Sequence, residues 1–216
     1  MNKQTGFTLI ELAIVLVIIG LLLGGVLRGQ ELINSAKVKN MARDFQNVQV
    51  YIYGYQDKYK ALPGDDLAAV AHLGATANQA GAGAGNGQIG GNWNSTITTD
   101  ESLIFWQHVR MAGLAPGTTV VAGTGTYIPT NADGGRIGIQ GLATPGVVPI
   151  LPTPMNGAYV VCSAGVLGKF AKQLDTTLDD GETSTGSMRV YVDAATAWAT
   201  SAAATDSSAF NVCMAF

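Results

Sequence analysis

The sequence has 216 residues, with 12 Lys and Arg against 15 Asp and Glu, and 47% of it is hydrophobic. A chain with this share of apolar residues can bury a hydrophobic core, so the composition excludes an intrinsically disordered protein. A formal net charge of −3 argues against nucleic-acid binding through a basic surface. Two cysteines are too few for a disulfide-dense miniprotein.

The apolar residues are concentrated near the N-terminus. From Phe7 to Leu27 the polar side chains are Thr8 and Glu11 alone. As a helix this segment is about 31 Å long, which matches a hydrocarbon core of roughly 30 Å. A secretory signal peptide has a shorter apolar region and a small-residue cleavage site after it. We therefore expect the segment to cross a membrane and to stay in the mature protein.

Glu11 is unusual because a carboxylate within an apolar helix is costly to place in lipid. Two interpretations follow from its position. The carboxylate either reaches headgroup water near the end of the segment or meets a cation that a neighbouring chain supplies.

The chain after this segment predicts an amphipathic continuation of the same helix. No proline occurs before Pro63, so we expect one helix from about Phe7 to Tyr59, with its second half packed against the rest of the protein. Apolar residues recur there at spacings of three and four, namely Val38, Met41, Phe45, Val48, Ile52, Tyr55, Tyr59 and Leu62.

The residues Gly6-Phe7-Thr8-Leu9-Ile10-Glu11, preceded by a short leader with Lys3, resemble the processing site of type IV prepilins and type II secretion pseudopilins. The resemblance implies cleavage between Gly6 and Phe7 by a prepilin peptidase and N-methylation of Phe7. It also implies that Glu11 pairs with the N-terminal amine of an adjacent subunit, which favours the second interpretation of its position. Identical or related pilin subunits are then the partners.

The fold that the resemblance implies is α+β and pilin-like, with the long N-terminal helix packed on an antiparallel sheet. We divide the chain into a leader (1–6), a membrane and assembly half of the helix (7–28), an amphipathic half (29–60) and a globular head (61–216). Gly20 and Gly24 have the spacing that lets membrane helices approach closely, although glycine is also common in such helices.

Charge and resemblance disagree about orientation. Four basic residues follow the apolar segment within 16 positions, whereas Lys3 alone precedes it, so the positive-inside rule would place the head in the cytoplasm. The resemblance implies the opposite, and two cysteines favour an oxidising compartment. We expect a bacterial inner-membrane protein with a periplasmic head, which becomes part of an extracellular filament on assembly.

The head is predicted to hold two short helices and an antiparallel sheet. The helices are expected near 103–114, after a capping-box pattern at Thr98–Glu101, and near 167–178. Strands are expected, from their β-branched residues and turn signals, at 118–128, 135–140, 146–150, 158–162 and 188–192. The pattern G-x-G-x-x-G at 85–90 is not interpreted as a dinucleotide site, because no strand precedes it and no helix follows.

Cys162 and Cys213 are the two cysteines of the chain. Outside the cytoplasm they would form one disulfide, and two buried thiols are the alternative. The resemblance favours the bond.

Four carboxylates gather within eight residues at Asp175, Asp179, Asp180 and Glu182. A helix that ends in an Asp-Gly turn accounts for them, and this interpretation is favoured. A calcium site is the alternative, because calcium prefers oxygen-rich loops. No other cofactor is expected.

No catalytic motif is present, and His72 and His108, the two histidines, accompany no nucleophile pattern. His108 is interpreted as a structural residue of a helix. The predicted function is therefore a structural subunit of a type IV pilus-like filament rather than an enzyme. Two alternatives stay open: a pseudopilin of a type II secretion system, and a membrane-anchored domain that binds or catalyses without polymerising.

Overall fold

The structure is a computed structural model, and it describes residues 8–79, 84–142, 155–192 and 198–216. The chain forms two compact units, the first ending at Lys37 and the second beginning at Val38. Helix α1 (Leu9–Tyr59) contributes to both units. It begins and ends within two residues of the predicted bounds.

The part of α1 in the first unit is apolar on all sides. Every side chain from Leu9 to Leu27 is exposed. An 18-residue window of this helix has a mean hydropathy of 2.8 and no buried residue, so α1 is long and apolar enough to cross a membrane. The helix is continuous through Arg28 and Gly29.

The part of α1 in the second unit buries the predicted apolar stripe. The six stripe residues from Val38 to Tyr55 are each at most 3% exposed, while Tyr59 is partly exposed. The helix ends because Lys60 adopts a left-handed conformation (φ 55°) and donates its N–H to the carbonyl of Gln56 at 2.8 Å.

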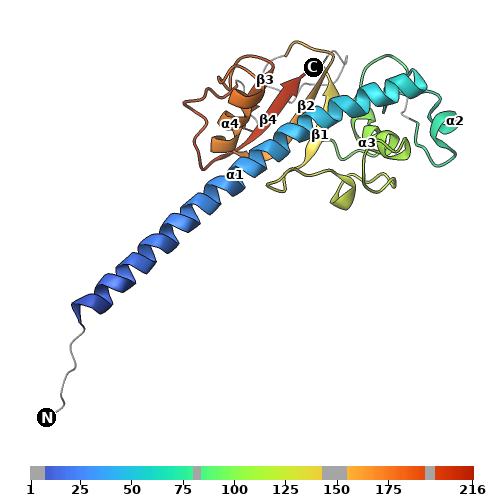
Figure 1. Cartoon of the computed structure of the whole chain (residues 1–216). Coiled ribbons are helices and arrows are strands. Elements are labelled where there is room, and N and C mark those ends of the chain that lie inside the picture. Colours follow the sequence, from blue (N-terminus) through green and yellow to red (C-terminus); the bar gives the residue numbers. More distant parts are fainter. Residues whose placement is uncertain (1–7, 80–83, 143–154, 193–197) are drawn as a thin grey trace. The chain divides into compact units, whose positions relative to one another are not determined.

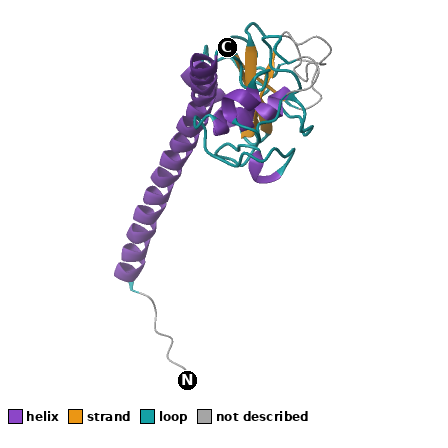
Figure 2. Cartoon of the chain, turned by 90° about the vertical axis from the view of Figure 1, so that its right-hand side faces the viewer, coloured by secondary structure: helices purple, strands orange, loops and turns teal. Residues whose placement is uncertain are grey.

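Four antiparallel strands form one sheet in the order β1-β2-β4-β3 (Figure 1). The strands are β1 (Ile137–Gly141), β2 (Tyr159–Leu167), β3 (Met188–Tyr191) and β4 (Ala209–Ala215). The helices of the second unit besides α1 are α2 (Ala69–Leu73), α3 (Glu101–Met111), the 3-10 turn η1 (Gly125–Tyr127) and α4 (Gly168–Leu178). Loops make up much of the rest (Figure 2). The layout is the α+β, pilin-like one that the sequence predicts.

The two faces of the sheet are covered differently. On one face Val161 and Val212 belong to the main core with Phe45 of α1 and Phe170 of α4. On the other face a smaller cluster contains Cys162, Cys213 and Tyr191, covered by Trp93 from a loop. This division follows from the alternation of side chains along a strand.

Both predicted head helices are present as α3 and α4, but one strand prediction is wrong and one strand was missed. Residues 118–128 form a loop with η1 rather than a strand. Their carbonyls serve side chains of α3 instead of a ladder: Thr118 accepts from Arg110 Nη1 and Thr119 accepts from Gln107 Nε2. Strand β4 was not predicted. The predicted strand at 146–150 lies outside the described residues.

The predicted capping box at Thr98 is also wrong. Helix α3 begins at Glu101, and no side chain caps it. The carboxylates of Asp100 and Glu101 instead bond the start of α3 to the preceding loop. Asp100 accepts from Ser95 Oγ at 2.5 Å, and Glu101 accepts from the Gly90 N–H at 2.6 Å.

Candidate assembly and processing site

The predicted cleavage site, Gly6 and Phe7, lies outside the described residues. The described chain begins at Thr8, directly before the first turn of α1. The geometry of this end of the molecule therefore rests on Thr8, Glu11 and the apolar surface that follows.

Thr8 and Glu11 form a reciprocal capping box at the start of α1. Glu11 Oε2 accepts from the Thr8 backbone N–H at 2.9 Å and from the Thr8 hydroxyl at 2.8 Å. The Glu11 N–H donates back to Thr8 Oγ1 at 3.3 Å. The carboxylate is thus held by its own helix, and it satisfies donors that the helix end leaves free. The pattern T-x-x-E before an apolar run is the signal that could have revealed this pair.

Gly20 and Gly24 leave an open strip on the exposed apolar surface of α1. A Cβ atom built on either residue would meet nothing within 4 Å apart from the helix's own neighbouring backbone. Packing within the described part of the chain therefore does not require glycine at these positions. The strip would let another helix approach closely.

The comparisons with known proteins fit this site. Residues 1–27 match the family model described as the prokaryotic N-terminal methylation motif, which is the prepilin-type cleavage and methylation segment. No curated protein and no solved structure matches the chain. The motif supports a protein of the type IV pilin or pseudopilin type, whose members are structural subunits.

Together with the exposed apolar helix, the motif indicates membrane anchoring. For proteins that carry it, the motif implies processing by a prepilin peptidase and assembly with related subunits.

The two cysteines form the disulfide that the resemblance favours. Cys162 on β2 and Cys213 on β4 lie directly opposite each other in the ladder and are bonded. Both are fully buried in the smaller cluster, on the face of the sheet away from α1. The bond joins the two central strands of the sheet.

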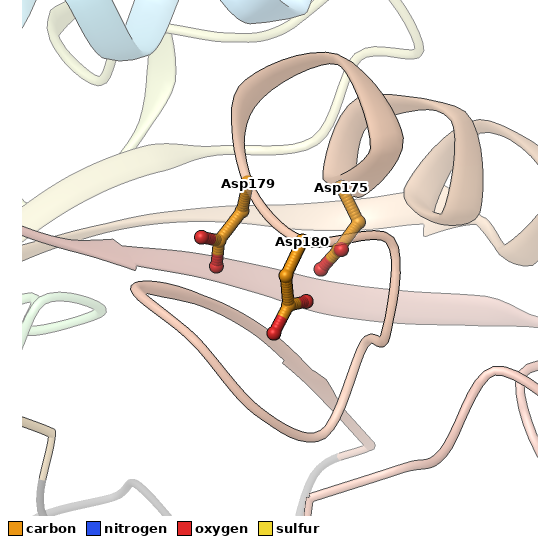
Figure 3. Close-up of side chains that lie close together, drawn as sticks. All are labelled: Asp175, Asp179 and Asp180. Carbon is orange, nitrogen blue, oxygen red and sulfur yellow. The ribbon is translucent and has the colours of Figure 1, made fainter.

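The predicted acidic cluster lies at the end of α4 (Figure 3). One oxygen from each of Asp175, Asp179 and Asp180 lies within 4.8 Å of the others, whereas Glu182 is not part of this group. Glu182 instead accepts from the Ser201 N–H at 2.9 Å.

Most oxygens of the cluster are engaged by the loop itself, as the turn interpretation requires. Asp175 Oδ1 accepts from the Gly181 N–H at 2.7 Å, Asp179 Oδ2 from the Met188 N–H at 2.7 Å, and Asp180 Oδ1 from the Glu182 N–H at 2.9 Å. Asp175 Oδ2 is buried and makes no hydrogen bond within the described residues. Burial, together with the neighbouring carboxylates, raises the pKa of Asp175 to about 6. Calcium binding here stays a prediction.

The glycine-rich loop at 85–90 surrounds a carboxylate of the protein itself. Asp65, 4% exposed, accepts from the backbone N–H groups of Gly85, Asn86 and Gly87. Consecutive N–H groups of this kind form an anion-binding nest. Here the nest fixes the loop to the turn after α1, which agrees with the interpretation that it holds no dinucleotide.

The histidines have structural partners. His108 Nδ1 accepts from the Gly64 N–H at 3.0 Å, and its Nε2 lies 2.7 Å from the Asn78 carbonyl. Burial lowers the pKa of His108, so it is neutral and suits these roles. His72 Nδ1 lies 2.7 Å from Asp66, which also accepts from the Tyr55 hydroxyl at 2.7 Å.

Proposed function

We propose that this chain is a structural subunit of a type IV pilus-like filament. A prepilin peptidase cleaves between Gly6 and Phe7, the new amine of Phe7 is methylated, and the mature chain assembles through α1. The observation that carries this proposal is the match of residues 1–27 to the methylation motif, on a helix whose first half has no protein cover.

The exposed surface of α1 gives assembly its physical basis. From Leu9 to Leu27 the helix exposes apolar side chains on every face, with Glu11 as its one charged group. Lipid can cover this surface before assembly, and neighbouring helices can cover it afterwards. Removal of the leader creates a positive amine four residues before Glu11. When two subunits are staggered, the amine of one and the Glu11 carboxylate of the other neutralise each other. This pairing fixes the register between subunits more than it adds to net stability.

Before assembly the subunit stands in the bacterial inner membrane with its head in the periplasm, and after assembly it is extracellular. The disulfide supports this orientation, since disulfides persist in oxidising compartments. The role includes no chemical reaction. A pseudopilin of a type II secretion system is the second candidate, because the same motif and helix serve both.

The test is intact-mass spectrometry on sheared extracellular filaments and, separately, on membranes. We expect a chain that begins at methylated Phe7 and is lighter by the thiol hydrogens that the disulfide removes. Abundance in the sheared fraction supports the pilus subunit, and confinement to membranes supports the pseudopilin. A chain that still carries Met1–Gly6 contradicts both and leaves a membrane-anchored domain that does not polymerise.

Three variants separate the charge of Glu11 from its role as a helix cap. Glu11→Gln keeps a capping acceptor but removes the charge, so we expect filaments to be lost while α1 stays helical. Glu11→Ala removes both. Glu31→Ala is the matched control, because Glu31 is also an exposed glutamate of α1. Filaments of normal yield from Glu11→Gln would contradict charge pairing in assembly.

A further inference from the structure

A pocket of about 240 Å³ lies in the second unit, between α1, α3 and the loops before β1. From α1 it is lined by Asp44, Asn47 and Tyr51, whose spacing puts them on one face of the helix. From α3 it is lined by Trp106 and Arg110. The pocket is smaller than the roughly 300–1,000 Å³ of sites for drug-sized ligands, so it suits a small molecule.

Asp44 supplies an uncompensated negative group at this pocket. Its carboxylate is partly buried, and no hydrogen bond or ion pair within the described residues involves it. Burial raises the pKa of Asp44 to about 6, and no cation counteracts the rise. A partly desolvated carboxylate without a partner is unfavourable for the folded chain alone, and a cationic ligand would remove that penalty.

Arg110 supplies a fixed positive group at the same pocket. Its Nε donates to the Pro116 carbonyl at 3.1 Å and its Nη1 to the Thr118 carbonyl at 3.0 Å. The guanidinium lies 4.9 Å from the ring centre of Tyr127. These contacts fix the side chain, and its Nη2 amino group makes no hydrogen bond within the described residues.

The two charged groups face the same pocket without pairing. The ion pairs of the described residues do not include Asp44 with Arg110. Tyr51 is close enough to interact with both: burial raises its pKa, Asp44 adds to the rise and Arg110 opposes it. The pocket is therefore lined by a negative and a positive group, and both act electrostatically on the Tyr51 hydroxyl.

We propose that this pocket binds a free α-amino acid with an apolar side chain, its ammonium group at Asp44 and its carboxylate at Arg110. A zwitterion is the small ligand whose two charges match both groups at once, and guanidinium pairs with carboxylate through directed hydrogen bonds. The ring of Tyr51 adds a favourable surface for an ammonium group. The apolar walls at Trp106 and Ile137 suit the side chain. Binding at this site does not depend on filament assembly.

The test is isothermal titration calorimetry of the purified full-length chain in detergent micelles with each of the common L-amino acids. We expect at least one apolar amino acid to bind. Its N-acetyl derivative, which lacks the ammonium group, and its amide, which lacks the carboxylate, should not bind. No binding by any amino acid would overturn the proposal, and so would an amide that binds as tightly as the free amino acid.

The matched variants are Asp44→Asn and Asp57→Asn. Asp44 has no partner to lose, so Asp44→Asn should fold normally and bind about tenfold more weakly or worse. Asp57 is an exposed aspartate of the same helix outside the pocket, and Asp57→Asn should bind like the unmodified chain. Equal affinity of Asp44→Asn and the unmodified chain would contradict the assigned site. Arg110 is not substituted because it also holds two backbone carbonyls.

Discussion

Thr8 and Glu11 hold each other at the first turn of α1, with the Thr8 backbone N–H 2.9 Å and its hydroxyl 2.8 Å from one oxygen of Glu11. The residue that is expected to pair with a neighbouring subunit is therefore already bound within its own helix. A neighbour's amine does not need to find a bare carboxylate in lipid. In the proposed filament, the neighbour's amine would compete with the Thr8 donors for the Glu11 oxygen, or share it with them, and the capping box has already oriented that oxygen.

This relationship predicts the effect of removing the Thr8 hydroxyl. Thr8→Val keeps the shape of the side chain but loses the cap, which contributes about 1 kcal/mol at a typical helix N-terminus. We expect faster amide hydrogen exchange at residues 9–12 in micelles. Thr8→Ser retains the hydroxyl and should exchange like the unmodified chain. Equal exchange in Thr8→Val and Thr8→Ser would show that the cap does not hold the first turn.

The open strip at Gly20 and Gly24 predicts an assembly defect without a folding defect. A Cβ atom at Gly24 has open space around it in the described chain, and leucine is a better helix former than glycine by nearly 1 kcal/mol. We expect normal helicity and membrane levels but few sheared filaments. Gly25→Leu is the control, because Gly25 is equally open and lies on a different face of the helix. Equal filament yields from Gly24→Leu and Gly25→Leu would contradict close helix approach along this strip.

Features with a local signal could be predicted from the sequence. The length of α1, its stripe and its end at Tyr59 follow from periodicity and from the turn at Pro63, because helix contacts repeat every three to four residues. The capping box of Thr8 and Glu11 also has a local signal. The motif that resembles prepilins lies wholly within the first residues of the chain.

Features that depend on distant partners could not be predicted. Residues 118–128 have β-branched residues typical of a strand, yet Arg110 and Gln107 of α3 bind their carbonyls. The nest at Gly85 is filled by Asp65, twenty positions earlier. The pocket of Asp44 and Arg110 joins residues from two helices, which no spacing along the chain indicates.

The Tyr55 side chain bonds α1 to the turn that follows it. Its hydroxyl donates to Asp66, which is 1% exposed. Tyr55→Phe removes this bond and should lower the free energy of unfolding by about 1 kcal/mol, because Asp66 keeps its other donors. Tyr59→Phe is the control, since the Tyr59 ring stacks on His72 and the exchange preserves the ring.

The effect of Tyr55→Phe should depend on pH. Burial acts to raise the pKa of Asp66, but the bonds from His72, Tyr55 and Ala68 outweigh it and lower the pKa below 3.8. The stability that comes from these bonds is therefore present above pH 3.8 and is lost as the pH falls through the lower pKa of the folded state. Denaturation of both variants at neutral and acidic pH measures this. A difference that grows on acidification would contradict the assignment.

Asp175 predicts the opposite pH dependence. Burial raises its pKa from 3.8 to about 6, so the folded chain binds this proton more tightly than the unfolded chain. Its contribution to stability therefore falls as the pH rises from about 4 to about 6. Asp175→Asn keeps the acceptor for Gly181, removes the charge and places donors near Asp179 and Asp180. We expect Asp175→Asn to be more stable than the unmodified chain at neutral pH, with the advantage disappearing near pH 4.

The same variant decides between a turn and a calcium site at the end of α4. If the carboxylates only form the turn, added calcium leaves the thermal midpoint of both chains unchanged. If they bind calcium, the ion raises the midpoint of the unmodified chain and not that of Asp175→Asn, because a ligand stabilises only the folded state that binds it. Asp180→Asn serves as a comparison. Hydrogen bonds from Glu182 and Thr185 lower the pKa of Asp180, so loss of the Asp180 charge should destabilise the folded chain at neutral pH rather than stabilise it. A calcium response that survives in Asp175→Asn would place the ion elsewhere in the chain.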